Sequence, residues 1–270
     1  MTIALQPPRA AVAIARRPLD ILLPPRPLDG AGSVQSHGLG PRAWERIRFL
    51  DDPVCDGCGA PFDHDQGEGA RCAACQARPP AFDRARAACL YDEHARDLIL
   101  KLKHADRTDL APLFARWLAR AGADLLEDAD AVAPVPLHPA RLLRRRYNQA
   151  AEIARPLARL ARLAYLPDAL VRAKATPTQA GRSGDARRRN VAGAFRVAER
   201  WRPRLDGARI VLVDDVLTTG ATLEGCARVF KAAGVARVDA LVIARVQSSA
   251  ANSYMVRTPT SRFAEESPTP

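Results

Sequence analysis

Aromatic residues are scarce in this 270-residue chain, where Phe, Tyr and Trp together make up 5% of the sequence. Proteins that bind single strands by stacking bases on aromatic side chains generally need more of them. Only Tyr147 and Trp201 lie near the arginine-rich stretches and could stack a base, whereas Phe195 is predicted to be buried. The composition therefore argues against a binder that depends chiefly on base stacking.

Long hydrophobic runs are also missing. No apolar stretch approaches the roughly 18 residues needed to span a bilayer, and the first residues lack the compact apolar core of a signal peptide. We therefore predict a cytoplasmic protein with no membrane span. Residues 1–49 are basic and proline-rich, and residues 247–270 are rich in Ser, Thr and Pro, so both segments are predicted to be disordered.

The net charge of +11 is unevenly distributed along the chain. Residues 135–209, which we call the basic block, contain 18 basic and 5 acidic side chains, whereas residues 51–134 contain 10 and 16. A basic block of this kind can attract a diphosphate, a nucleic acid, or both. The same arginines could instead lie on solvated helix faces, and composition alone leaves these interpretations open.

Four of the six cysteines form two Cys-x-x-Cys pairs, separated by thirteen residues. Two such pairs can place four thiolates around one ion, and the spacing is close to that of a zinc ribbon. Disulfides are disfavoured in a cytoplasmic chain, and a redox pair would need only one Cys-x-x-Cys. We predict a structural Zn²⁺ held by Cys55, Cys58, Cys72 and Cys75. The module, over residues 50–82, is too small to fold without such a metal cross-link.

Three further residues could be taken for metal ligands. Four cysteines already complete a tetrahedral shell, so His64 is interpreted as a solvated loop residue. Cys89 and Cys226 lie on apolar patterns and are interpreted as core residues.

The remainder of the chain alternates short apolar runs with helical patterns. Buried strands are predicted at residues 87–91, 131–135, 210–213 and 238–246. Apolar residues at helical spacing from Leu223 to Phe230 indicate a helix between the last two strands, an order typical of a parallel α/β sheet. Pro156 interrupts another helical pattern, and predicts a kink or the start of a second helix.

The segment from Ile210 to Thr222 carries the most specific chemistry. Its apolar strand is followed by two adjacent acids, Asp214 and Asp215. Ligands of open α/β sheets bind at the carboxyl ends of strands, and a following helix start offers backbone N–H groups to an anion. Because ionised carboxylates accept hydrogen bonds from hydroxyl groups, the acids suit a sugar while the next loop suits a phosphate. A mere acidic turn is the alternative, and it leaves the Thr-Thr-Gly-Ala-Thr loop unexplained.

This segment resembles the signature with which type I phosphoribosyltransferases bind 5-phosphoribosyl-1-diphosphate (PRPP). By that resemblance Asp214 and Asp215 hold the ribose 2′ and 3′ hydroxyls and are the candidate catalytic residues. The 5′-phosphate would be held by Thr218, Thr219, Gly220, Ala221 and Thr222. The resemblance also implies that Mg²⁺ accompanies PRPP.

A polar, basic stretch without clear periodicity covers residues 176–190. Loops of this length in compact domains are generally functional or disordered. Its place before the signature strand resembles the position of the mobile hood that type I phosphoribosyltransferases keep over the diphosphate. Arg187, Arg188 and Arg189 are therefore candidate diphosphate contacts, with a flexible solvated loop as the alternative.

The order of motifs along the chain is similar to that of the ComF family. In sequence these are the four-Cys module, the Pro134–His138 loop, the Arg145–Gln149 stretch, the run from Thr176 to Phe195, and the PRPP signature. The family often has Gly-Phe where this chain has Arg146-Tyr147. The resemblance implies an α/β fold, with a zinc-ribbon module before a phosphoribosyltransferase-like parallel-sheet domain over residues 83–246. It also implies a role in DNA uptake during natural transformation, with single-stranded DNA and DNA-processing proteins as partners.

Two functions are consistent with these motifs. The first is a PRPP-binding protein of DNA uptake. The second is an active phosphoribosyltransferase of nucleotide metabolism, which would transfer the ribose phosphate to a base and release diphosphate. The sequence contains no recognisable acceptor site for the second function.

Overall fold

The structure of the protein, a computed structural model, describes residues 38–104, 107–174 and 193–247. The chain divides into two compact units, residues 1–46 and residues 47–270. In the first unit the described part contains one short helix, α2 (Pro41–Glu45), which starts after Gly40 with proline in its first turn. All elements discussed below belong to the second unit.

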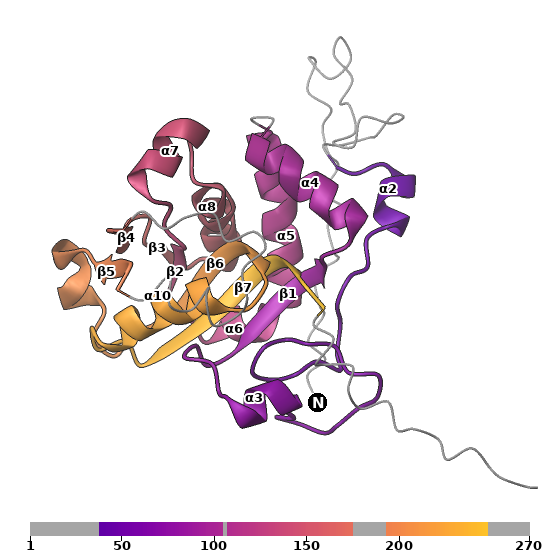
Figure 1. The fold of residues 1–270 in the computed structure, drawn as a ribbon, viewed down its shortest axis with the longest axis horizontal. Coiled ribbons are helices and arrows are strands. Elements are labelled where there is room, and N and C mark those ends of the chain that lie inside the picture. The colour runs from indigo at the N-terminus through magenta and orange to yellow at the C-terminus, as the bar shows by residue number, and fades with distance from the viewer. Residues whose placement is uncertain (1–37, 105–106, 175–192, 248–270) are drawn as a thin grey trace, which may run out of the picture. The chain divides into compact units, whose positions relative to one another are not determined.

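A five-stranded parallel sheet organises the second unit (Figure 1). The strands lie in the order β1, β7, β6, β2, β3, and each neighbouring pair is parallel. Their bounds are β1 (Ala85–Leu90), β2 (Ala131–Pro134), β3 (Ala164–Tyr165), β6 (Arg209–Leu217) and β7 (Arg237–Arg245). Two short strands, β4 (Leu170–Arg172) and β5 (Phe195–Val197), form a separate antiparallel pair.

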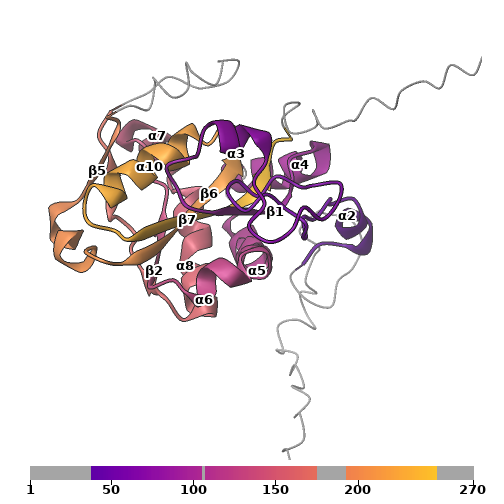
Figure 2. The ribbon, with the colours of Figure 1, turned by 90° about the horizontal axis from the view of Figure 1, so that it is seen from below.

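Helices cover both faces of the sheet (Figure 2). On one side lie α5 (Ala111–Ala121), α6 (Ala123–Glu127) and α8 (Gln149–Ala161), and on the other lies α10 (Ala221–Lys231). The remaining helical elements are α3 (Ala73–Ala77), α4 (Glu93–His104), η1 (Thr108–Leu110), α7 (Pro139–Arg145) and η2 (Glu199–Arg204). Because both faces are covered, consecutive residues from Ile210 to Val213 are all buried, which explains why this strand does not alternate.

The predicted parallel α/β class is confirmed, and the four predicted strands correspond to β1, β2, β6 and β7. β6 is longer than predicted, because β7 continues to pair with it after β2 has ended. α8 continues through Pro156, so no second helix begins there. Its neighbours Ile153 and Leu157 are fully buried, and this packing offsets the hydrogen bond that proline cannot donate.

The four-Cys segment belongs to the same compact unit as the sheet. The predicted boundaries at residues 49, 82 and 246 stay predictions. Residues 1–37 of the predicted disordered lead and residues 248–270 of the predicted tail lie outside the described part. Within the described ranges, no helix combines the length and apolar character that crossing a bilayer requires.

Candidate functional site

The two acids of the signature lie in β6, at a point where the strand has a partner on only one side. The pairing of β2 with β6 ends at Pro134 opposite Val213, and one further bond joins the Val135 N–H to the Val213 carbonyl at 2.9 Å. Pro134 and Pro136 have no N–H, so β2 cannot extend the ladder. β7 continues to pair with β6 as far as Leu217, so Asp214 and Asp215 are held in strand geometry beside an edge that β2 leaves open.

Asp215 is neutralised by a lysine that sequence reasoning did not identify. Lys103, in the last turn of α4, places its Nζ 2.8 Å from Asp215 Oδ2, and both side chains are 18% exposed. In the sequence this residue stands at a polar break between two apolar patterns, far from the signature. No local signal links the two positions, because only the packing of α4 brings them together.

Asp214 has an altered acidity. Burial and the neighbouring carboxylate of Asp215 raise the pKa of Asp214 to about 7. The Asp215 N–H, which donates to Asp214 Oδ1 at 2.8 Å, favours the ionised form, as do the nearby cations Lys103 and Arg172. The carboxylates therefore form a pair in which Asp215 has an ion-pair partner and Asp214 titrates near neutral pH.

Arg172 is a second cation missed by sequence reasoning. It ends β4 and is 5% exposed, and its guanidinium lies 5.3 Å from the centre of the Phe195 ring on β5. The antiparallel pair β4–β5 thus supplies a positive charge near the acid pair, since Arg172 favours the ionised form of Asp214.

The loop after β6 leads directly into α10. Gly220 is the residue before the helix and has a φ of 77°, a left-handed conformation that favours glycine. No side chain caps this helix start, so its first N–H groups are donors that an anion could accept from. The Thr219 hydroxyl is buried and has no hydrogen-bond partner within the described part of the chain. Thr218 is exposed, and Ala221 begins the helix.

The structure thus places the predicted acids and the predicted loop at the same end of β6, joined by Val216 and Leu217. A pair of carboxylate acceptors and a set of hydroxyl and N–H donors lie next to each other, which suits a ligand that combines hydroxyl groups with an anionic group. The predicted hood residues Arg187, Arg188 and Arg189 lie outside the described residues.

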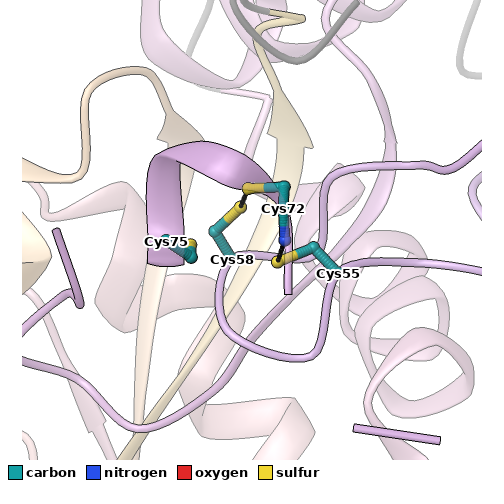
Figure 3. A group of neighbouring side chains, drawn as sticks. All are labelled: Cys55, Cys58, Cys72 and Cys75. Carbon is teal, nitrogen blue, oxygen red and sulfur yellow. Dashed lines mark hydrogen bonds between the residues drawn. The ribbon is translucent and has the colours of Figure 1, made fainter. Parts of the chain in front are cut away.

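A second site is formed by the four cysteines (Figure 3). The Sγ atoms of Cys55, Cys58, Cys72 and Cys75 all lie within 4.8 Å of one another, and those of Cys58 and Cys72 are 3.7 Å apart. Two thiolates on a tetrahedral zinc ion with bonds of about 2.3 Å would be roughly 3.8 Å apart. These four side chains could therefore hold a metal ion such as zinc.

The backbone around the cysteines is shaped for this convergence. The Cys72 N–H donates to Cys55 Sγ at 3.2 Å, and the start of α3 puts Cys75 one turn after Cys72. Gly59 turns the chain with a φ of 65°, and a Cβ there would lie 2.6 Å from the Ala85 carbonyl oxygen, so only glycine fits.

The other candidate ligands behave as their sequence positions indicated. His64 is exposed and lies outside the cysteine cluster. Cys89 and Cys226 are fully buried, and the Cys89 thiol donates to the Ile243 carbonyl at 3.2 Å.

Replacing Asp214 should change how stability depends on pH. Because the pKa of Asp214 is about 7 in the folded protein and about 4 in an unfolded chain, the folded state holds an extra proton between these values. Stability should therefore fall as pH rises from about 4 to about 7. Asp214→Asn removes this loss and should be more stable than wild type by on the order of 1–3 kcal/mol above pH 7. This free energy is smaller than the full pKa shift implies, because Asp214 is partly exposed to solvent.

Urea unfolding between pH 5 and pH 8.5 measures this effect. Asp63→Asn, which removes an exposed carboxylate from the cysteine segment, is the matched control and should follow wild type. Equal stability of wild type and Asp214→Asn across the whole range would contradict the raised pKa.

Comparison with known proteins places this arrangement in a family. The family described as phosphoribosyl transferase domain matches residues 149–266. The solved structure of the glutamine PRPP amidotransferase of B. subtilis complexed with ADP and GMP is 20% identical and covers 50% of this chain and 26% of its own. The TM-score of this match is 0.35.

Two curated relatives are similar over most of their length. DNA utilization protein YhgH of Escherichia coli (strain K12) is 31% identical over 206 residues, which cover 74% of this chain and 87% of that protein. Competence protein F of Haemophilus influenzae is 31% identical over 217 residues, covering 78% of this chain and 92% of that protein. With the cysteine cluster, the parallel sheet and the signature segment in the same chain, this protein belongs to the ComF family, with DNA utilization protein YhgH and Competence protein F as relatives.

Proposed function

We propose that this protein binds PRPP, or a closely related ribose phosphate, at the carboxyl end of β6 and acts in the cytoplasm in DNA uptake. The observation that carries the proposal is the adjacency of the Asp214–Asp215 pair and the Thr218–Thr222 loop at the carboxyl end of β6, where β2 no longer pairs with it. The phosphoribosyl transferase match over residues 149–266 supports the ligand class.

The acid pair would bind the ribose ring. A vicinal diol offers two O–H donors, and two adjacent carboxylates are the acceptors that it needs. Lys103 already pairs with Asp215 and holds its side chain in place, which limits the reorganisation that ligand binding requires.

The loop would bind the 5′-phosphate. The N-terminus of α10 favours negative charge, and the buried Thr219 hydroxyl, which lacks a partner in the described chain, would gain one from a phosphate oxygen. Arg187, Arg188 and Arg189 would cover the diphosphate. Mg²⁺ would accompany PRPP and neutralise part of the diphosphate charge.

The cysteine centre would hold a structural Zn²⁺. All four ligands are thiolates, which leaves no open coordination position for a reacting water molecule. We therefore propose that the ion stabilises the folded cysteine segment and takes no part in a reaction.

The role in DNA uptake rests on the relatives and on the basic block. The two curated relatives carry the names DNA utilization protein and Competence protein F. In the described part of the basic block, several arginines are exposed, including Arg155, Arg159 and Arg162. Such a surface can bind the phosphates of single-stranded DNA, and DNA-processing proteins would be the protein partners.

A second candidate function, phosphoribosyl transfer, is favoured by one specific observation. A carboxylate with a pKa of about 7 can accept a proton at neutral pH, and Asp214 has this value beside the proposed ribose site. Asp214 would then take a proton from the incoming base as diphosphate leaves.

Replacing both acids should abolish ligand binding. Asp214→Asn combined with Asp215→Asn removes two charged acceptors, and we expect PRPP–Mg²⁺ binding to weaken by at least about 100-fold in calorimetry. The matched control is Asp51→Asn with Asp52→Asn, another adjacent pair of acids that is exposed. The fold and the metal content should be unchanged in both variants. Wild-type affinity in the signature variant would contradict the assignment of the PRPP site to Asp214 and Asp215.

Diphosphate release distinguishes binding from turnover. The protein is incubated with labelled PRPP, Mg²⁺ and a panel of bases, and a transferase should release diphosphate faster with one base than with none. Asp214→Asn should slow that release by about 100- to 10,000-fold, the usual contribution of a general base. If no base accelerates release, the protein binds PRPP without transferring it.

Binding of single-stranded DNA should depend on salt through the basic block. On a plot of log affinity against log salt, Arg159→Gln with Arg162→Gln should reduce the slope by about 1.4, or about 0.7 for each lost phosphate contact. Arg116→Gln, on α5 outside the basic block, should leave the slope unchanged. Filter binding or fluorescence anisotropy measures the slope. Negligible wild-type affinity, or affinity independent of salt, would remove the basic block as a DNA surface.

A further inference from the structure

Arg245 is a buried cation in direct contact with the cysteine centre. It ends β7 and is 6% exposed, and its guanidinium donates to the Cys58 carbonyl at 2.6 Å and approaches Cys58 Sγ at 3.5 Å. Its contacts among the described residues are to Cys58 and include no carboxylate, and its Nε has no hydrogen-bond partner there. A buried charge of this kind is costly unless an opposite charge lies near it.

The cysteine centre can supply that opposite charge. Four thiolates around a divalent ion carry a net double negative charge. The position of Arg245 against Cys58 is therefore favourable when the centre holds its metal. Without metal no common ion fixes the four sulfur atoms, so the contact between the guanidinium and Cys58 is held less firmly.

Arg245 also lies beside the end of β6, directly before the Thr218–Thr222 loop. Arg245 lies opposite Leu217 in the parallel ladder, and the next N–H, that of Val246, donates to the Leu217 carbonyl at 2.9 Å. Leu217 is the last residue of β6 and directly precedes Thr218. The side chain of Arg245 thus contacts the cysteine centre, and the backbone N–H of the next residue, Val246, holds Leu217 at the start of the loop.

A second contact joins the cysteine segment to the loop. Phe82, which follows the four cysteines in sequence, is 3% exposed, and a Cβ built on Gly220 would lie 3.6 Å from its Cε1 atom. The next residue, Asp83, exchanges two hydrogen bonds of 2.8 Å with Val238 and pairs with Lys231 at 2.9 Å. Asp83 therefore anchors the chain next to Phe82 to β7 and to the last turn of α10, and the Phe82 ring lies beside Gly220 in the loop.

We propose that Arg245 and Phe82 are positioning residues through which the loaded cysteine centre holds the Thr218–Thr222 loop in its ligand-binding shape. The proposal rests on the proposed function of that loop as a phosphate site. Metal at the centre and ligand at the loop are then thermodynamically coupled, and each should strengthen the binding of the other by the same factor.

Hydrogen exchange of the ligand-free protein tests the coupling independently of PRPP. Removing the metal with a transition-metal chelator should raise exchange at residues 55–75 and also at residues 217–222. Exchange should change little at β2, which lies on the opposite side of β6 from β7, and at α8, which packs against β2. If exchange rises only at residues 55–75, the metal stabilises only its own segment, and the coupling is disproved whatever ligand the loop binds.

Variants at the two ends of β7 distinguish the role of Arg245 from a general effect of changing an arginine in this strand. Arg245→Met should raise exchange at residues 217–222 even with metal supplied, and should weaken PRPP–Mg²⁺ binding about tenfold, a typical coupling factor. Arg245→Lys keeps the charge and should restore most of the exchange protection and most of the PRPP–Mg²⁺ affinity. The matched control is Arg237→Met, at the other end of β7, where the arginine pairs with Asp239 and Asp128; it should leave the loop unchanged.

Metal retention gives the reciprocal measurement and covers the case in which Arg245→Met fails to fold. In the wild type and in Arg245→Lys, saturating PRPP–Mg²⁺ should slow the loss of zinc to a chromogenic chelator, and Phe82→Leu should reduce this protection. If PRPP binds but zinc loss is unaffected, the coupling fails while the proposed function stands. If PRPP does not bind although chelation still loosens residues 217–222, the coupling stands and the proposed ligand is wrong.

Discussion

The ladder between β6 and β7 is the interaction on which both candidate sites depend. It runs from Arg209 opposite Arg237 to Leu217 opposite Arg245, and it continues after β2 has ended at Pro134. The signature acids are therefore held in strand geometry while one side of the strand stays open to a ligand. A ladder that stopped with β2 would leave the same acids in a turn, with their spacing set only by local chain flexibility.

Cations from distant parts of the chain lie beside the acid pair and beside the cysteine cluster. Lys103 from α4 pairs with Asp215, Arg172 from β4 lies near Asp214, and Arg245 from β7 contacts Cys58. The formal charge of +11 is thus only partly a surface property. Some of it is structural, because carboxylates or thiolates gathered in one place repel one another unless a cation is packed beside them.

The sequence predicted which side chains of the local motifs lie together, because those side chains are carried by neighbouring residues. The Cys-x-x-Cys pairs bring their thiols together through tight turns, and the signature acids are adjacent in the chain. Lys103 and Arg245 could not be predicted, since their roles arise only when α4 packs near the sheet edge and β7 ends at the cysteine segment. The length of β6 was underestimated for a similar reason: a pair of acids normally ends a strand, but here the neighbouring strand continues to bond with it.

The sequence by itself determined the fold class, the four thiols that could hold a metal, and the acid pair and loop of the candidate ligand site. These follow from residue type and short-range spacing, which set local geometry before any long-range contact forms. Only the tertiary structure decided which edge of β6 stays open, which cations balance the acids, and which residues join the cysteine centre to the loop. Such properties depend on contacts between segments far apart in the chain, and no local pattern encodes where those segments meet.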